Sequence, residues 1–284
     1  MDVVRSTDSF FNFLLHFPHL TANNVLSLFL LTLFRILPII VFAPFLGGRN
    51  LPNPVKIMFG IALASIFIPT VLASSKGAVE FNWLYLGYSL KELAIGFILG
   101  FLIAIPFFIG QASGSLIDHA RGSASLQVTD PTTQTQTGPL GLLYNYALIA
   151  IFFAIGGPFY FFNAVADSFQ LVPVDAFFNP HFFSMNVPFW HLVVKLLYHV
   201  MSLAVQLAAP SLIGILMVEM FLGIANRLAP QVQIVFLGIP LKSWTGLALL
   251  SLAWVFILKQ LGKESLEWVK VINNIIHSTH FYKS

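Results

Sequence analysis

Cysteine is absent from this chain of 284 residues, and charged residues are scarce. The first absence excludes disulfides, thiolate metal sites and catalysis by a cysteine nucleophile. Asp, Glu, Lys and Arg together make up 9% of the residues, whereas a soluble domain carries about 25%. So little charge cannot cover a surface that faces water. The scarcity therefore indicates an integral membrane protein.

Enzyme motifs are also missing. The chain contains no Gly-x-Ser-x-Gly elbow, no P-loop and no His-Glu-x-x-His pair. His191 and His199 lie about two helical turns apart, which is too far for them to share one metal. Basic residues are scattered rather than clustered, so nucleic acid is not an expected partner. We expect no catalytic site, no metal and no cofactor.

Long apolar stretches dominate what is present, since 57% of the residues are hydrophobic and 30 are Phe. A helix needs about 20 apolar residues to cross the hydrocarbon core. Stretches that approach this length are Val25–Phe45, Val55–Leu72, Leu93–Ile109, Leu140–Ala166, Leu196–Val218 and Ser243–Leu258. Helix is expected because every backbone polar group in lipid must be paired within its segment. The expected fold is an all-α membrane protein of about six apolar helical segments.

Both ends of the chain have an amphipathic pattern. The apolar faces comprise Phe10, Phe13, Leu14 and Phe17 at one end, and Leu261, Trp268, Ile272 and Ile275 at the other. We expect residues 1–24 and 259–284 to form amphipathic segments, each lying at the membrane interface or docking on a partner. Residues 25–258 are expected to form a single helical membrane domain with a polar loop at 111–138.

Proline and glycine interrupt several apolar stretches. The interruptions are Pro38, Pro44, Gly100, Pro106, Gly110, Gly156, Gly157, Pro158, Pro210 and Gly214. Proline removes a helix hydrogen bond and bends the axis. Such breaks are tolerated where protein or a cavity surrounds the backbone. They are either simple kinks or signs of broken helical hairpins that pack against partner subunits.

Two charged residues belong to the apolar pattern. Arg35 lies in the middle of the first stretch, and Glu219 directly follows the uncharged fifth stretch. Buried charges are destabilising unless satisfied, and they are often functional. We expect each to pair with another buried group, with Arg35 and Glu219 as a candidate pair. A proton-relay role for Glu219 is the alternative.

Residues 111–138 form the most polar stretch of the chain. Its candidate functional residues are Asp118, Arg121, Gly122, Gln127, Asp130, Pro131, Gln134, Gln136 and Gly138. Its hydroxyls and amides need partners or water, so the stretch cannot lie in lipid. It is either an exposed surface loop or a segment that lines or closes an aqueous path.

A second unusual connection spans residues 226–242. It mixes polar groups and prolines into an apolar background, with Asn226, Arg227, Pro230, Gln231, Gln233, Pro240 and Lys242. The pattern predicts a helix end, a turn and a re-entry.

These two connections resemble the FliR/SctT family of inner-membrane export-apparatus proteins of bacterial type III secretion. The first similarity is Asn226-Arg227-x-Ala229-Pro230-Gln231 followed by Pro240-x-Lys242. The second is Ile117-Asp118-x-x-Arg121-Gly122 followed by Asp130-Pro131 and Pro139-Leu140-Gly141. The first hairpin also matches, through Arg35, Pro38, Pro44, Gly48 and Pro52. The context of Arg121 is more similar to the injectisome branch than to the flagellar branch, although Ala120 stands where many relatives have Gln.

The resemblance implies a non-enzymatic core subunit of the export gate. Such a subunit forms part of the pore through which unfolded substrates cross the bacterial inner membrane, and its loop, here 111–138, helps to plug the closed channel. The implied partners are FliP/SctR-like and FliQ/SctS-like subunits, a FlhB/SctU-like switch protein, transported polypeptides and membrane lipid. Residues 226–242 would anchor subunit contacts. A small-solute transporter would instead show two related halves, and an intramembrane enzyme would need a nucleophile and its base.

Overall fold

The computed structural model describes residues 22–48, 51–75, 77, 79–122, 128–129, 136–177, 188–228 and 234–278. The helices are α2 (Ala22–Phe42), the short 3-10 helix η1 (Pro44–Leu46), α3 (Asn53–Ser74), α4 (Trp83–Ala120), α5 (Pro139–Ala154), α6 (Gly157–Leu171), α7 (Pro188–Leu228) and α8 (Ile234–Ser278). One antiparallel pair of two-residue strands, β1 (Val128–Thr129) and β2 (Gln136–Thr137), is the only sheet in the described residues. The all-α prediction is confirmed.

The number of membrane segments also agrees with the sequence. Five described helices are long and apolar enough to cross a membrane, and the bent pair α5–α6 would make a sixth. Three helices are longer than their apolar stretches, because α4 has 38 residues, α7 has 41 and α8 has 45. The predicted loop from residue 111 was therefore wrong at its start, since 111–120 form the last turns of α4.

Proline and asparagine set where several helices begin. Proline stands in the first turn of α3, α5 and α6, where its missing N–H is no loss. At the start of α4, the Asn82 side chain accepts a hydrogen bond of 2.7 Å from the Trp83 N–H. Acidic residues are absent from all of these first turns. The chain thus starts these helices with little use of charge.

The fourth apolar stretch is a broken hairpin. Gly156 has a positive φ of 74° between α5 and α6, and the two helices meet at 75°. A Cβ on Gly157 would lie 2.3 Å from the Phe152 ring, so the sharp bend also needs a bare backbone there. The prediction of broken helices is confirmed here.

Helices α2 and α4 pack with their backbones unusually close. A Cβ on Gly96 would lie 2.1 Å from the Arg35 carbonyl oxygen, and one on Gly100 would lie 3.0 Å from Ile39 Cα. Glycines four residues apart let two helices approach in this way. The close contact holds Arg35 against the side of α4.

An aromatic cluster joins the end of α2 to the bent pair. The break after α2 turns Phe45 inward, where its ring centroid lies 4.8 Å from that of Phe152 and 5.7 Å from that of Phe161. Phe107 of α4 completes the cluster. Rings at these distances stabilise a core beyond their simple burial.

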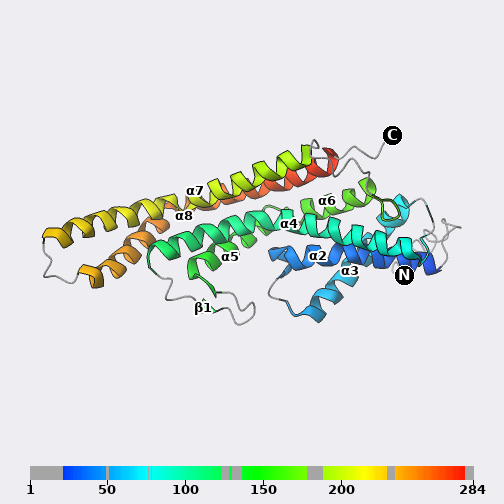
Figure 1. Ribbon diagram of the computed structural model, residues 1–284, viewed down its shortest axis with the longest axis horizontal. Helices are drawn as coiled ribbons and strands as arrows, with labels where there is room; N and C mark the ends of the chain where they lie inside the picture. Colours follow the sequence, from blue (N-terminus) through cyan, green and yellow to red (C-terminus); the bar gives the residue numbers. More distant parts are fainter. Residues whose placement is uncertain are drawn as a thin grey trace, which may run out of the picture.

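The helices α7 and α8 run side by side along the molecule, and their tip extends past the other helices (Figure 1). The start of α2 and the end of α8 lie at the opposite end of the molecule. The segment from 259 does not form a separate tail, because it continues α8 to Ser278. Leu261 and Trp268 of its apolar face are buried in the chain itself. The amphipathic face predicted at 10–17 lies outside the described residues.

Candidate functional site

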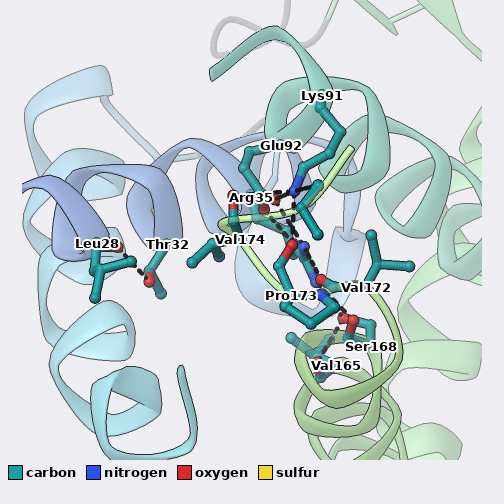
Figure 2. A network of polar contacts seen from close by, with 11 residues as sticks. Leu28, Thr32, Arg35, Lys91, Glu92, Val165, Ser168, Val172, Pro173 and Val174 are labelled. Carbon is teal, nitrogen blue, oxygen red and sulfur yellow. Dashed lines mark hydrogen bonds and ion pairs between the residues drawn. The ribbon is translucent and has the colours of Figure 1, made fainter. Parts of the chain in front are cut away.

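Three charged side chains meet in the interior of the helical body (Figure 2). Arg35 of α2 and Glu92 of α4 have no exposed side-chain surface, and the Lys91 side chain is 3% exposed. The Arg35 guanidinium donates two hydrogen bonds to the Glu92 carboxylate, at 2.5 and 2.9 Å. The Lys91 ammonium lies 2.7 Å from the same carboxylate. One buried anion is therefore shared by two buried cations.

Backbone carbonyls balance the second positive charge. Arg35 also donates to the carbonyls of Ser168 and Val172, at 2.8 and 2.7 Å. Lys91 donates to the carbonyls of Pro173, Val174 and Ala176 at 2.7–3.1 Å. All five carbonyls belong to the end of α6 and the turn that follows it. The C-terminal end of a helix carries partial negative charge, so cations stabilise it.

This charge cluster, formed by Arg35, Lys91 and Glu92, explains how the broken hairpin can end inside the protein. The last carbonyls of a helix have no partner within the helix and must be satisfied elsewhere. Here two long cationic side chains supply those donors, while the Phe169 ring lies 4.2 Å from the guanidinium. The cluster therefore fixes α6 to both α2 and α4.

The predicted pairing of Arg35 with Glu219 was wrong. Arg35 binds Glu92, and Glu219 of α7 forms its ion pair with Lys242 of α8. The Glu219 side chain is 46% exposed, so within this chain it is not a buried charge. Its pair with Lys242 instead links the two helices of the long hairpin near its tip.

The base of the polar loop is closed by one carboxylate. Asp118, near the end of α4, is 3% exposed and accepts a hydrogen bond of 2.9 Å from the Leu140 N–H in the first turn of α5. Its other oxygen accepts hydrogen bonds from Arg121 at 2.5 and 3.0 Å. An acidic group at a helix N-terminus stabilises the unpaired N–H groups there. Asp118 thus ties α5 to α4 where the loop leaves and returns.

Glycines make this closure possible. A Cβ on Gly138 would lie 2.0 Å from the Asp118 carboxylate, and one on Gly114 would lie 2.4 Å from the Leu140 carbonyl oxygen. A side chain at either position would push α5 away from α4. Gly138, predicted as a loop residue, is therefore part of the loop's base.

The remaining predicted gate residues fall into two groups. Arg121 and Gly122 end α4, and Gln136 lies in the short strand β2. Gln127, Asp130, Pro131 and Gln134 lie outside the described residues. The strand pair aligns Val128 with Thr137, so the two arms of the loop run antiparallel.

We expect Asp118→Asn to weaken the base of the loop. An amide presents one oxygen and one NH2 group, and the NH2 group would face donors from either Arg121 or Leu140. The loss should be about 1–2 kcal/mol of stability, or a Tm lower by roughly 2–4 °C, measured by thermal unfolding in detergent. Glu267→Gln, which removes an exposed pair of 3.8 Å with Lys263, is the control and should change nothing. An unchanged Tm for Asp118→Asn would contradict the capping role.

The predicted subunit-contact motif lies at the tip of the α7–α8 hairpin. Asn226 and Arg227 are exposed in the last turn of α7, and Pro240 and Lys242 lie early in α8. Pro230, Gln231 and Gln233 lie outside the described residues. Between the two helices is an open apolar groove of about 490 Å³, lined by Phe221, Leu222, Ala225, Leu237, Pro240, Leu241 and Trp244. The helix end and the re-entry predicted from the sequence are confirmed.

Sequence reasoning missed Lys91 and Glu92. Both precede the third apolar stretch and look like its polar boundary. The close packing of α2 on α4 had a usable signal in the pair Gly96 and Gly100, which has the spacing typical of closely packed membrane helices.

Comparison with known proteins gives a consistent result. A family model described as bacterial export proteins, family 1, matches residues 26–267. The Yop proteins translocation protein T of Yersinia pestis is 32% identical, covering 80% of this chain and 82% of that protein. The flagellar biosynthetic protein FliR of Bacillus subtilis is 30% identical, covering 78% and 84%. The surface presentation of antigens protein SpaR of Shigella flexneri is 28% identical, covering 74% and 78%.

Proposed function

The chain belongs to the family of bacterial export proteins described as family 1, and we propose that it is a core subunit of a type III secretion export gate. It is a multi-pass protein of the inner membrane with five or six apolar helical segments. In this proposal it contributes to a protein-conducting pore for unfolded polypeptides, without catalysing a reaction. The context of Arg121 favours the injectisome branch. A translocation protein and a flagellar protein match at nearly the same identity, so this preference stays a prediction.

The main support for this proposal is the length of the exposed apolar surface on α7. Helices of 41 and 45 residues are roughly 60–70 Å long, whereas the hydrocarbon core is about 30 Å thick. Large apolar side chains are exposed along most of α7, at Val194, Tyr198, Met201, Val205, Ile213, Leu216, Met217, Met220, Phe221, Ile224 and Leu228. Lipid can cover only about half of this length. Neighbouring protein subunits are the natural cover for the rest, as exposed apolar patches usually mark interaction sites.

The partners that fit are other membrane subunits of the export apparatus. We assign them as FliP/SctR-like, FliQ/SctS-like and FlhB/SctU-like proteins, following the family resemblance. The hairpin tip offers them an apolar groove, and the same two helices carry Arg227 and the Glu219–Lys242 pair. A mostly apolar contact with a few charged groups at its rim is typical of stable interfaces.

The polar loop fits the role of a plug. Its base is fixed to the body by Asp118, which holds the first turn of α5 against the end of α4. A segment that is anchored at its base can close a path and then move without unfolding the core. Its Thr and Gln side chains can pack and hydrogen-bond across an aqueous opening.

We expect Arg227→Ala to reduce the recovery of partner subunits. Arg227 is exposed at the end of α7, so its removal should leave the chain folded. Arg is among the residues whose truncation weakens interfaces most, by about 2 kcal/mol at a central position. Co-purification from membranes with tagged variants measures the effect, and Gln231→Ala in the same motif should act alike.

Lys263→Ala is the matched control for that experiment. Lys263 is an exposed basic residue of α8, and its side chain is 67% exposed. It lies outside the hairpin tip, so its removal should leave recovery unchanged. Full recovery of partners with Arg227→Ala would remove the hairpin tip from the proposed interface.

A further inference from the structure

A buried proline interrupts α4 in its middle. Pro106 has no N–H, so the carbonyl of Leu102, four residues earlier, has no hydrogen-bond donor within the helix. Leu102 is 4% exposed, and the following residues to Phe107 are buried as well. Water therefore cannot satisfy this carbonyl, and a buried acceptor without a donor is strongly destabilising.

The missing donor comes from the other end of the chain. The Trp268 indole Nε1–H donates a hydrogen bond of 2.6 Å to the Leu102 carbonyl oxygen. Trp268 belongs to the last part of α8, here called the C-terminal arm (residues 259–271). Leu261, Ser265 and Val269 on the same arm are at most 5% exposed. The arm is therefore packed against the body where Pro106 interrupts α4.

We propose that Trp268 is a positioning residue that completes α4 at Pro106 and fixes the bend that a proline imposes on a helix axis. A phenylalanine would fill much of the same space but could not donate. Trp is suited to the position because it combines a large apolar ring with one N–H that needs a partner when buried. The arm thus supplies the hydrogen bond to the Leu102 carbonyl that α4 cannot make within itself.

The contact between Trp268 and Leu102 joins two parts of the chain that belong to the proposed gate. Beyond Pro106, α4 carries Asp118 and the polar loop. Before the arm, α8 forms half of the hairpin whose tip bears Lys242. The arm therefore couples the subunit-contact hairpin to the helix that carries the loop. This last step, from bend to gate, rests on the proposed function, whereas the bend itself does not.

The test is a double-mutant cycle between Trp268→Phe and Pro106→Ala, measured on the full chain with its partners. Since the chain has no cysteine, spin labels can be placed on cysteines introduced at Leu86 and Leu116, which are exposed on either side of the bend. Trp268→Phe should shift or broaden the distance between the labels and lower the Tm by roughly 2–4 °C. In Pro106→Ala the restored N–H of residue 106 can donate to the Leu102 carbonyl, so Trp268→Phe should then cause a smaller loss than it does when residue 106 is proline.

A control on the same helix separates ring packing from hydrogen bonding. Trp254 stacks edge-on with Tyr144 at 5.5 Å, and Trp254→Phe should have the same effect whether residue 106 is proline or alanine. Equal losses for Trp268→Phe in both backgrounds, or no loss in either, would overturn the proposal. An altered bend with an unchanged ion leak would support the positioning role and count against the step from bend to gate.

Discussion

Replacing Arg35 with leucine is expected to prevent the chain from accumulating as a folded protein. The substitution leaves Glu92 with Lys91 as its remaining ion-pair partner of this cluster, and it removes the donors to the carbonyls of Ser168 and Val172. Breaking a buried ion pair by removing one member costs about 3–5 kcal/mol, which is a large part of the stability of most proteins. The yield of monodisperse protein from a fluorescent fusion, separated by size in detergent, measures the loss.

Two further variants make that result specific. Arg35→Lys keeps the charge, but an ammonium cannot reach Glu92, Ser168 and Val172 together, so its yield should lie between those of the parent and Arg35→Leu. Lys263→Leu removes an exposed charge and should leave the yield unchanged. A parental yield for Arg35→Leu would mean that the charge cluster does not hold α6 in place.

The sequence predicted that Arg35 is a buried charge, but it could not identify its partner. Glu92 lies 57 residues away and directly before an apolar stretch, where a charge usually marks the water-facing end of a helix. Glu92 can lie in the interior because Arg35 and Lys91 neutralise its carboxylate. Hydropathy describes each segment alone, so it cannot show that charges from two segments neutralise each other. The apolar stretches themselves were located correctly for the same reason, since apolar length is a local property.

The C-terminal amphipathic segment and the polar stretch 111–138 also had partners that the sequence could not identify. The face containing Leu261 and Trp268 was recognised from its spacing, yet spacing does not say whether lipid, a partner or the chain's own α4 covers that face. Asp118 was selected for its place in a polar stretch. Its contact with Leu140 lies across 22 residues, so capping could not be distinguished from gating. In both cases the pattern revealed the chemistry of a residue but not its partner.

Deleting residues 127–136 is expected to make the assembled gate leak small ions while the complex still forms. The ends of α4 and α5 already touch through Asp118 and Leu140, so the five residues left between Gly122 and Gly138 can join them without strain, as short connections between neighbouring helices commonly do. Assembly should therefore survive, because the deletion leaves the body and the hairpin tip unchanged. Ion flux in cells or in reconstituted membranes should rise several-fold.

A replacement of the same ten residues by glycine and serine separates the bulk of the loop from its chemistry. If the loop closes the path by filling it, the replacement should leak less than the deletion, because length and volume are largely kept. If hydrogen bonding by the Gln and Thr side chains is decisive, the two variants should leak alike. Parental flux in the deletion, with a fully formed complex, would show that closure depends on other parts of the assembly. Asp118 would then serve only to join α5 to α4. A firmly fixed loop base is needed by an ordinary structural turn as well as by a plug.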